Sequence, residues 1–266
     1  MTKHVRFSLA RDARATVPDS DPSVHYGVLE DGRVYETAPL SAKRNGASHE
    51  MPAVRLLPPT WPTQIVCVGR NYADHARELG NEPPPEPILF FKPNSCLAAH
   101  GDPIVYPRLS ELLSYEGELA MVVGRRGRNV PRERALDIVF GYTAMNDVTA
   151  RDLQRKDNQW TRAKGFDTFG PVGPWIVPQA EVDLSQLRVQ TRVDGVLKQN
   201  GSLMDLLFGL DVIIAYITEF MTLEPGDLIA TGTPPGVGAL EPGSVVEVEV
   251  TGVGRLENRV IGKEGP

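Results

Sequence analysis

The chain has 266 residues, of which 41% are hydrophobic and 23% charged, so it can bury a substantial core and lacks the composition of a disordered or fibrous protein. Its 28 basic and 34 acidic side chains give a net charge of −6 and are interspersed, which argues against nucleic acid as a partner. The sequence contains no apolar run of about 18 residues, and residues 1–10 lack the apolar core that a signal peptide has. We therefore expect a cytoplasmic protein that does not enter a membrane.

The first part of the chain predicts a small β-rich domain. Short stretches of alternating apolar and polar residues flank Asp31-Gly32, a dipeptide that strongly favours a hairpin turn. Three prolines within residues 57–62 then disfavour regular structure and mark a linker. We expect a small domain over residues 1–60 and a larger one over residues 63–266.

The larger domain is expected to consist mainly of strands. Apolar stretches predict strands at 64–69, 118–124, 227–231, 244–251 and 255–261. Helical spacing predicts helices at 74–79, from residue 149 onward, and over 203–220. The expected fold class is therefore α+β and predominantly β.

Two carboxylates, Glu116 and Glu118, stand at the beginning of an apolar strand. Side chains alternate along a strand, so these two would project from the same face. Neighbouring anions repel unless a proton or cation joins them, and a hard divalent cation with oxygen ligands is the usual solution. The alternative is a pair of solvated acids at a strand end, and the segment alone does not separate the two interpretations.

Asp147 is the candidate for a third ligand, because it ends another apolar stretch just before a helical pattern. Its alternative role is as an N-cap of that helix. Three carboxylates without a histidine or cysteine nearby in the sequence suit Mg²⁺ or Mn²⁺ and disfavour zinc.

The predicted helix at 74–79 carries His75 and Glu78 at positions i and i+3, within hydrogen-bonding reach. A carboxylate beside an imidazole raises its basicity and fixes its tautomer, as a water-activating base requires. The plain alternative is a solvated pair on a surface helix. Because the helix is too short to be stable alone and prolines follow it, residues 74–87 have the pattern of a mobile lid.

Two further segments could bind a small anion. Lys164 lies in an irregular stretch and could meet a carboxylate or simply reach solvent from the surface. Residues 231–238, which include Thr233, follow a predicted strand and offer hydroxyls and backbone N–H groups that suit a carboxylate. They lack the lysine and spacing of a phosphate-binding P-loop.

The chain resembles the fumarylacetoacetate hydrolase family in six segments that occur in the same order: NYADHARELG, FFKPNS, YEGELAMVVG, NDVTARDLQ, RAKGFDTFGPVG and ATGTPPGVG. The resemblance begins near residue 64. It implies a mixed β-sandwich roll, usually assembled as a homodimer, for the larger domain.

The resemblance also implies roles for individual residues. It makes Glu116, Glu118 and Asp147 ligands of Mg²⁺ or Mn²⁺, and it makes His75, Glu78 and Lys164 catalytic residues. Pocket positions of the family align with Arg70, Tyr72 and Thr233, with a looser match for Arg70 and Tyr72.

The activity implied is metal-dependent hydrolysis of a C–C bond in a small, acylpyruvate-like 2-oxo acid. Family members that decarboxylate oxaloacetate-like acids or isomerise hydroxymuconate-like dienes are the alternatives, because the motifs do not separate these reactions. A catalytically silent 2-oxo acid binding protein is the alternative from outside the enzymes, and the dyad beside three acids argues against it.

Overall fold

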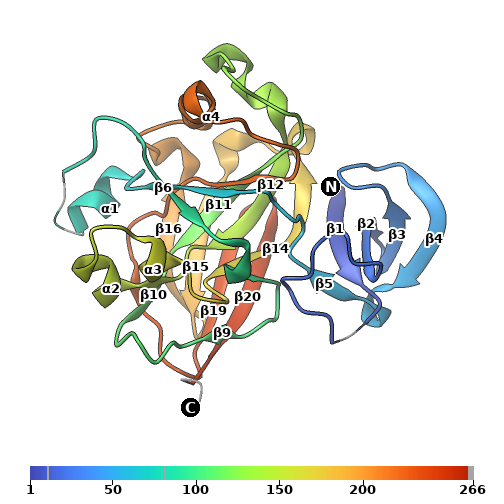
Figure 1. The fold of residues 1–266 in the computed structure, drawn as a ribbon, viewed down its shortest axis with the longest axis horizontal. Coiled ribbons are helices and arrows are strands. Elements are labelled where there is room, and N and C mark those ends of the chain that lie inside the picture. Colours follow the sequence, from blue (N-terminus) through green and yellow to red (C-terminus); the bar gives the residue numbers. More distant parts are fainter. Residues whose placement is uncertain (11, 79, 81, 263–266) are drawn as a thin grey trace.

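The computed structural model describes residues 1–10, 12–78, 80 and 82–262 (Figure 1). The α-helices are short: α1 (Ala73–Glu78), α2 (Arg151–Lys156), α3 (Thr161–Lys164) and α4 (Leu210–Phe220). Six 3₁₀ helices are also described: Met51–Ala53, Asn94–Cys96, Arg132–Ile138, Gln179–Glu181, Leu184–Gln186 and Leu203–Asp205. Strands contain more of the described residues than all these helices together, so the prediction of a predominantly β fold is confirmed.

Within the described residues the largest sheet has twelve strands. Ten follow in the order β4 (Arg44–Glu50), β3 (Arg33–Thr37), β2 (Val24–Glu30), β1 (Lys3–Ser8), β14 (Gly170–Pro178), β12 (Val139–Asn146), β11 (Gly117–Val123), β17 (Leu228–Ala230), β6 (Ile65–Gly69) and β7 (Ile88–Lys92). The other two are β5 (Arg55–Leu57), paired with β1, and β8 (Leu97–Ala98), paired with β14.

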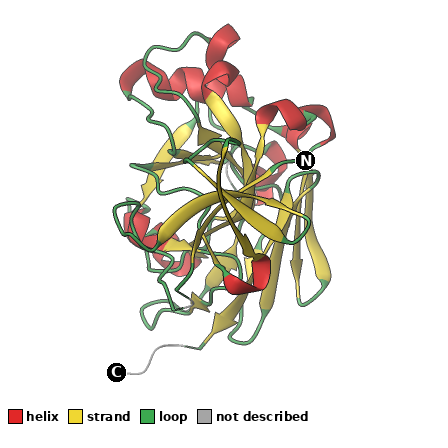
Figure 2. Cartoon of the chain, turned by 90° about the vertical axis from the view of Figure 1, so that its right-hand side faces the viewer, coloured by secondary structure: helices red, strands yellow, loops and turns green. Residues whose placement is uncertain are grey.

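Two smaller sheets complete the β structure of the described residues. One has the order β16 (Val196–Ser202), β15 (Arg188–Val193), β19 (Val245–Val250), β20 (Gly254–Ile261) and β9 (Ile104–Val105). The other contains β13 (Thr149–Ala150), β10 (Leu113–Tyr115) and β18 (Gly238–Ala239). Buried Leu119 of β11, Val248 of β19 and Ile213 of α4 belong to one apolar cluster, so the sheets and the longest helix share a core. Figure 2 shows the strands crossing the middle of the molecule and several helices gathered at its top.

Five of the strands were predicted from apolar stretches. The observed β6, β11, β17, β19 and β20 differ from the predicted ranges by at most one residue at either end. The hairpin around Asp31-Gly32 is also confirmed, because β2 and β3 pair on either side of it and both turn residues have positive φ, 47° and 77°.

Strands β1–β5 lie at one side of the molecule, opposite α1, α2 and α3 (Figure 1). They enclose a small core of Val5, Phe7, Val34 and Leu56. β1 joins the rest of the large sheet through His4, which pairs with Ile176 of β14. The division into a small domain over residues 1–60 and a larger one over residues 63–266 stays a prediction, and residues 263–266 lie outside the described residues.

Two predicted helices begin later than expected. Residues 149 and 150 form β13, and α2 starts at Arg151. The predicted helix over 203–220 is a short 3₁₀ helix followed by α4, which begins at Leu210. The break arises because Asn71 accepts hydrogen bonds from the amides of Leu207 and Phe208, both at 2.8 Å, which takes these amides away from a helix. α1 matches its predicted range up to Glu78, while residue 79 lies outside the described residues.

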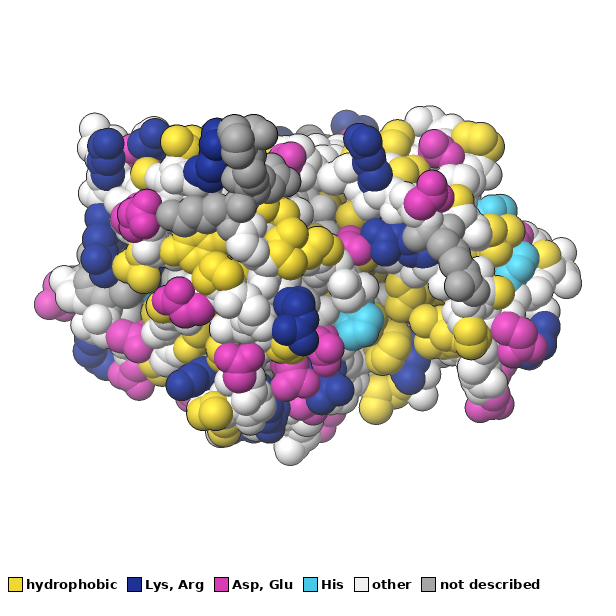
Figure 3. All heavy atoms as spheres, turned by 90° about the horizontal axis from the view of Figure 1, so that it is seen from below, with side chains coloured by type: hydrophobic (Ala, Val, Ile, Leu, Met, Phe, Trp, Pro, Cys, Tyr) yellow, Lys and Arg dark blue, Asp and Glu magenta, His cyan; other side chains and the backbone are white. Residues whose placement is uncertain are grey.

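Among the described residues, no helix combines the length and apolar character needed to cross a membrane. On the face shown in Figure 3, acidic and basic side chains are mixed and neither sign forms a broad patch. This mixture agrees with the interspersed charges of the sequence.

Candidate metal and substrate site

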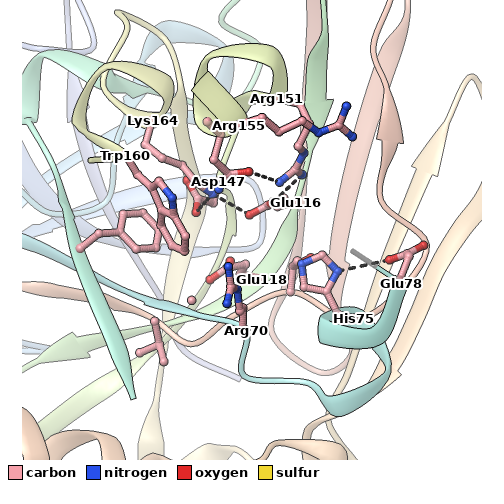
Figure 4. Close-up of a pocket in the computed structure, with 15 residues that line it drawn as sticks. Arg70, His75, Glu78, Glu116, Glu118, Asp147, Arg151, Arg155, Trp160 and Lys164 are labelled. Atoms are coloured by element: carbon pink, nitrogen blue, oxygen red, sulfur yellow. Dashed lines mark hydrogen bonds and ion pairs between the residues drawn. The ribbon is translucent and has the colours of Figure 1, made fainter. Parts of the chain in front are cut away.

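A cavity of about 330 Å³ opens between α1, α2, α3 and the ends of the central strands (Figure 4). Its volume lies in the range of small-molecule sites. It is lined by Val68, Gly69, Arg70, His75, Glu78, Phe90, Glu116, Glu118, Asp147, Arg151, Gln154, Arg155, Trp160, Lys164 and Thr233. Eight of the nine site residues expected from the sequence are therefore on one cavity.

Strand pairing brings the three predicted metal acids together. β11 and β12 are antiparallel, with Glu118 opposite Met145, so the residue before β11 and the residue after β12 lie side by side. Each of Glu116, Glu118 and Asp147 offers an oxygen within 4.8 Å of the others. At most 5% of any of these residues is exposed, which excludes the alternative of solvated acids. Asp147 is not an N-cap either, because Ala150 holds that position for α2.

Buried cations compensate two of the three acids. Lys164 Nζ lies 2.7 Å from Glu116 Oε2 and 2.6 Å from Asp147 Oδ2. Arg151 Nη2 donates to Glu116 Oε1 at 2.5 Å. Burial alone would raise the pKa of Glu116, but the charges of Lys164 and Arg151 outweigh it and lower the pKa below its usual value. The two carboxylates also raise the pKa of Lys164 despite its burial, so its ammonium stays charged.

Glu118 has a different environment. Its Oε2 accepts a hydrogen bond from Gly232 N at 2.8 Å, but among the described residues no cationic side chain forms a salt bridge with it. Burial, then repulsion by Asp147 and Glu116, raises its pKa well above the usual value. A buried acid without a cationic partner, beside two other carboxylates, fits a hard divalent cation held by oxygen ligands.

The predicted dyad borders the same cavity. His75 Nδ1 lies 3.2 Å from Glu78 Oε2, and only 4% of His75 is exposed, so it is not a solvated surface residue. The Glu78 side chain is one-third exposed. In Figure 4 the imidazole stands between the acid trio and Glu78. The arrangement leaves Nε2 as the ring nitrogen that does not face Glu78.

Two of the three predicted pocket residues line the cavity, and the third does not. Arg70 lines the cavity, where its guanidinium lies 6.0 Å from the ring of Trp160. Thr233 also lines it, but its hydroxyl donates to Gly117 O at 2.8 Å and accepts from Gln199, so it already has two partners. Tyr72 is buried and is not among the residues that line the cavity, but burial and then the charge of Glu118 raise the pKa of its phenol, and its contact with substrate stays a prediction.

Sequence reasoning missed several residues of the site region, among them one buried lysine, two arginines and a tryptophan. Lys92 ends β7, is 2% exposed, and donates from Nζ to Asp147 Oδ1 at 2.7 Å. A lysine at the end of an apolar strand was the available signal, because a buried ammonium requires an anion. Arg151, Arg155 and Trp160 line the cavity from α2 and the segment after it, and Arg151 lies in a segment already quoted for the family resemblance.

The fold and the acid trio define a predominantly β protein with a candidate metal site, and comparison with known proteins identifies its family. Residues 64–261 match the family model described as fumarylacetoacetate (FAA) hydrolase C-terminal. The chain therefore belongs to the fumarylacetoacetate hydrolase family.

Individual relatives cover most of the chain. A protein of Archaeoglobus fulgidus without a functional name is 48% identical over 88% of this chain and 94% of its own length. The mitochondrial oxaloacetate tautomerase fahd2 of Xenopus laevis is 40% identical over 91% of this chain and 80% of its own.

Two solved structures bear on the site. The 2-hydroxyhepta-2,4-diene-1,7-dioate isomerase of Mycobacterium marinum is 37% identical, with a TM-score of 0.86 and full coverage of both chains. The fumarylpyruvate hydrolase of Pseudomonas aeruginosa, solved with Mn²⁺ and pyruvate, is 35% identical, with a TM-score of 0.72 over 79% of this chain and 92% of its own. The named relatives are thus enzymes of differing reactions within one family.

Proposed function

We propose that this chain is a divalent-metal-dependent enzyme that hydrolyses a C–C bond in a small, acylpyruvate-like 2-oxo acid. The observation that carries the proposal is the placement of a buried imidazole, backed by a carboxylate, on the same cavity as three buried metal-type acids. Hydrolysis of such a substrate needs both an electron sink and an activated water.

Glu116, Glu118 and Asp147 would hold Mg²⁺ or Mn²⁺. When bound, such an ion polarises the 2-oxo group of a substrate and stabilises negative charge that develops on it. Lys164 and Arg151 keep Glu116 ionised as a ligand, and Lys164 also donates a hydrogen bond to Asp147. The Lys164 ammonium also supplies positive charge at the cavity wall, where it favours an anionic substrate.

Guanidinium groups provide the further means of binding a carboxylate. Arg70 and Arg155 line the cavity from different segments, one after β6 and the other on α2. Arginine pairs with carboxylates through parallel N–H donors, and Arg70 also lies near the face of Trp160. We propose that these two residues hold a substrate carboxylate at the cavity mouth.

The proton path follows from the dyad. With the Nδ1 proton directed to Glu78, Nε2 of His75 accepts a proton from water, whose oxygen bonds to the distal carbonyl carbon of the substrate. The bond between that carbon and carbon 3 breaks, and its electron pair remains on carbon 3. Return of the proton to carbon 3 completes the reaction, so one water and one acylpyruvate give pyruvate, or a relative of it, and one carboxylic acid.

A second candidate function is isomerisation, tautomerisation or decarboxylation of a 2-oxo diacid. The support is the names of relatives: the oxaloacetate tautomerase YisK of Bacillus subtilis is 41% identical, and the solved M. marinum relative is an isomerase. These reactions need proton transfer at carbon or loss of CO₂, and the same cavity residues serve both. A silent binding protein would have no use for the buried His75–Glu78 pair.

The deciding experiment is a substrate panel. Acylpyruvates, oxaloacetate and hydroxydiene diacids would be assayed with Mg²⁺ or Mn²⁺, with products identified by mass spectrometry. We expect release of a carboxylic acid and a 2-oxo acid from an acylpyruvate. Turnover of a diene diacid or of the enol form of oxaloacetate, with acylpyruvates untouched, would replace hydrolysis by the second candidate.

Two expectations about the whole protein remain proposals. We propose that the chain forms a homodimer, as its family resemblance implies, and that it acts in the cytoplasm. Light scattering of the purified protein would test the first, and cell fractionation the second.

A further inference from the structure

The carboxylate of Glu78 has a second partner besides His75. Gly236 N donates to it, at 3.0 Å from Oε1 and 3.2 Å from Oε2. Gly236 belongs to the loop between β17 and β18, far from α1 in the sequence. One side chain of a helix of only six residues therefore both orients the imidazole and attaches the helix to the loop.

The loop itself is held in place at this point. Tyr115 Oη donates to the carbonyl oxygen of Gly236 at 2.8 Å, and Tyr115 is 3% exposed. Gly236 has φ +100°, and a Cβ atom there would lie 2.1 Å from Lys198 O, so only glycine fits. Gly236, whose amide donates to Glu78, is thus held in two ways. Its backbone conformation is one that only glycine fits, and its carbonyl oxygen accepts a hydrogen bond from a buried phenol.

Tyr115 is suited to this task by its position and its chemistry. It ends β10, pairs with Gly238 of β18, and directly precedes Glu116 of the acid trio. A tyrosine hydroxyl can donate a hydrogen bond, and Tyr115 Oη is placed to give its proton to Gly236 O. Its hydroxyl is directed to Gly236, so it is not free to act on substrate.

We propose that Tyr115 is a positioning residue: through Gly236 it fixes the backbone N–H on which Glu78 docks, and so holds α1 with the His75–Glu78 dyad at the cavity. The docked arrangement links the strand that leads into the acid trio to the helix that carries the imidazole. Its kinetic consequence rests on the proposed function, whereas the docking itself does not.

Hydrogen exchange of the full-length protein tests the docking directly. Tyr115→Phe should accelerate exchange of the amides of residues 73–78 roughly 2- to 10-fold, the range expected for the loss of one hydrogen bond. Calorimetric affinity for Mn²⁺ should stay unchanged, because the acid trio is intact. Tyr26→Phe is the matched control, since it removes a phenol that donates to Asp19 among the N-terminal residues and should leave exchange in α1 unaltered.

Variants of Glu78 connect the effect to the same contact. Glu78→Ala should accelerate exchange in α1, and adding Tyr115→Phe to it should produce less than the product of the two separate effects, because one docking contact is then removed twice. Glu78→Gln keeps an oxygen acceptor for Gly236 and should exchange more slowly than Glu78→Ala. If Tyr115→Phe proves unstable, the comparison of the two Glu78 variants still tests the contact.

The kinetic consequence is a selective loss. On the substrate found by the panel, Tyr115→Phe should lower kcat and leave KM nearly unchanged, because metal and substrate groups remain while the dyad is misplaced. Unchanged exchange in Tyr115→Phe, equal acceleration in Tyr26→Phe, or multiplicative effects in the double variant would overturn the inference. Accelerated exchange together with a wild-type protein that turns over no panel substrate would refute the proposed function and leave the docking role standing.

Discussion

Lys92 Nζ and Asp147 Oδ1 lie 2.7 Å apart, and both side chains are almost fully buried. Asp147 Oδ2 meets Lys164 at the same time, so both oxygens of this carboxylate have an ammonium partner. Lys92 itself does not line the cavity. It acts on the site through Asp147, which it holds in one orientation.

Lys92→Met should destabilise the metal-free protein by about 3 kcal/mol, because it leaves a buried carboxylate with one partner fewer. Mn²⁺ should recover part of the loss, since a cation at the trio compensates the same charge. Thermal unfolding in chelator and in Mn²⁺ measures both effects. The exposed Lys156→Met is the control, and equal unfolding temperatures for the two variants in chelator would contradict the assignment.

Removal of metal should abolish activity. Three buried carboxylates without a nitrogen or sulfur ligand among the trio select hard cations, so Mg²⁺ or Mn²⁺ should restore turnover after chelation. Assays of the chelated and reloaded protein, with metal content measured by elemental analysis, provide the check. Full turnover by protein verified to be metal-free would contradict the prediction.

Glu116→Gln should weaken Mn²⁺ binding and activity together. The loss of affinity should exceed the roughly 10- to 100-fold that removal of a supporting residue costs, because a ligand itself is changed. Glutamine is preferable to alanine, since Glu116 also pairs with buried Arg151 and Lys164 and its amide oxygen keeps one acceptor there. Calorimetry compares it with Glu133→Gln, an exposed acid elsewhere, and equal Mn²⁺ affinity in both would remove Glu116 from the site.

Metal binding should release a proton and become tighter as pH rises. Burial and the neighbouring acids raise the pKa of Glu118, so in metal-free protein it keeps its proton to a higher pH than an ordinary glutamate. A cation binds the ionised form, and affinity therefore increases up to that raised pKa. Calorimetry in two buffers of different ionisation enthalpy detects the proton. Binding heats that do not depend on the buffer would contradict it.

His75→Ala should separate hydrolysis from decarboxylation. Hydrolysis of an acylpyruvate should fall ~10²-fold or more, as is typical for loss of a general base, whereas any decarboxylation of oxaloacetate should fall much less because it needs chiefly an electron sink. Asp147→Ala should damage both. Equal losses of the two activities in His75→Ala would assign the imidazole a role common to both reactions, such as proton delivery.

The sequence was sufficient where structure depends on local pattern. Strand β11 was predicted from an apolar stretch, and the hairpin at Asp31-Gly32 was predicted from its turn residues. The contact between His75 and Glu78 follows from their spacing of about one helical turn. The convergence of Asp147 with the glutamate pair was also within reach, because the start of one strand and the end of its antiparallel neighbour lie at the same edge of a sheet.

What could not be predicted depends on contacts between distant segments. The start of α4 is set by Asn71, which lies more than 130 positions earlier and takes the amides that would have continued a helix. Nothing in the sequence around Tyr115 indicates its positioning role, because that role depends on a hydrogen bond to the Gly236 carbonyl in a loop far along the chain.

The pairing of β1 with β14 has a consequence for how the protein avoids unwanted association. β14 lies between β12 and β1, so the N-terminal strands extend the sheet beyond it. An uncovered strand at that position would offer unpaired backbone groups to any passing chain, which is a route to aggregation. The N-terminal strands move the boundary of the sheet outward to β4, whose charged ends, Arg44 and Glu50, and irregular pairing with β3 make a poorer template. Loss of these strands would thus expose an aggregation-prone sheet edge, although the residues that line the cavity would all remain in the chain.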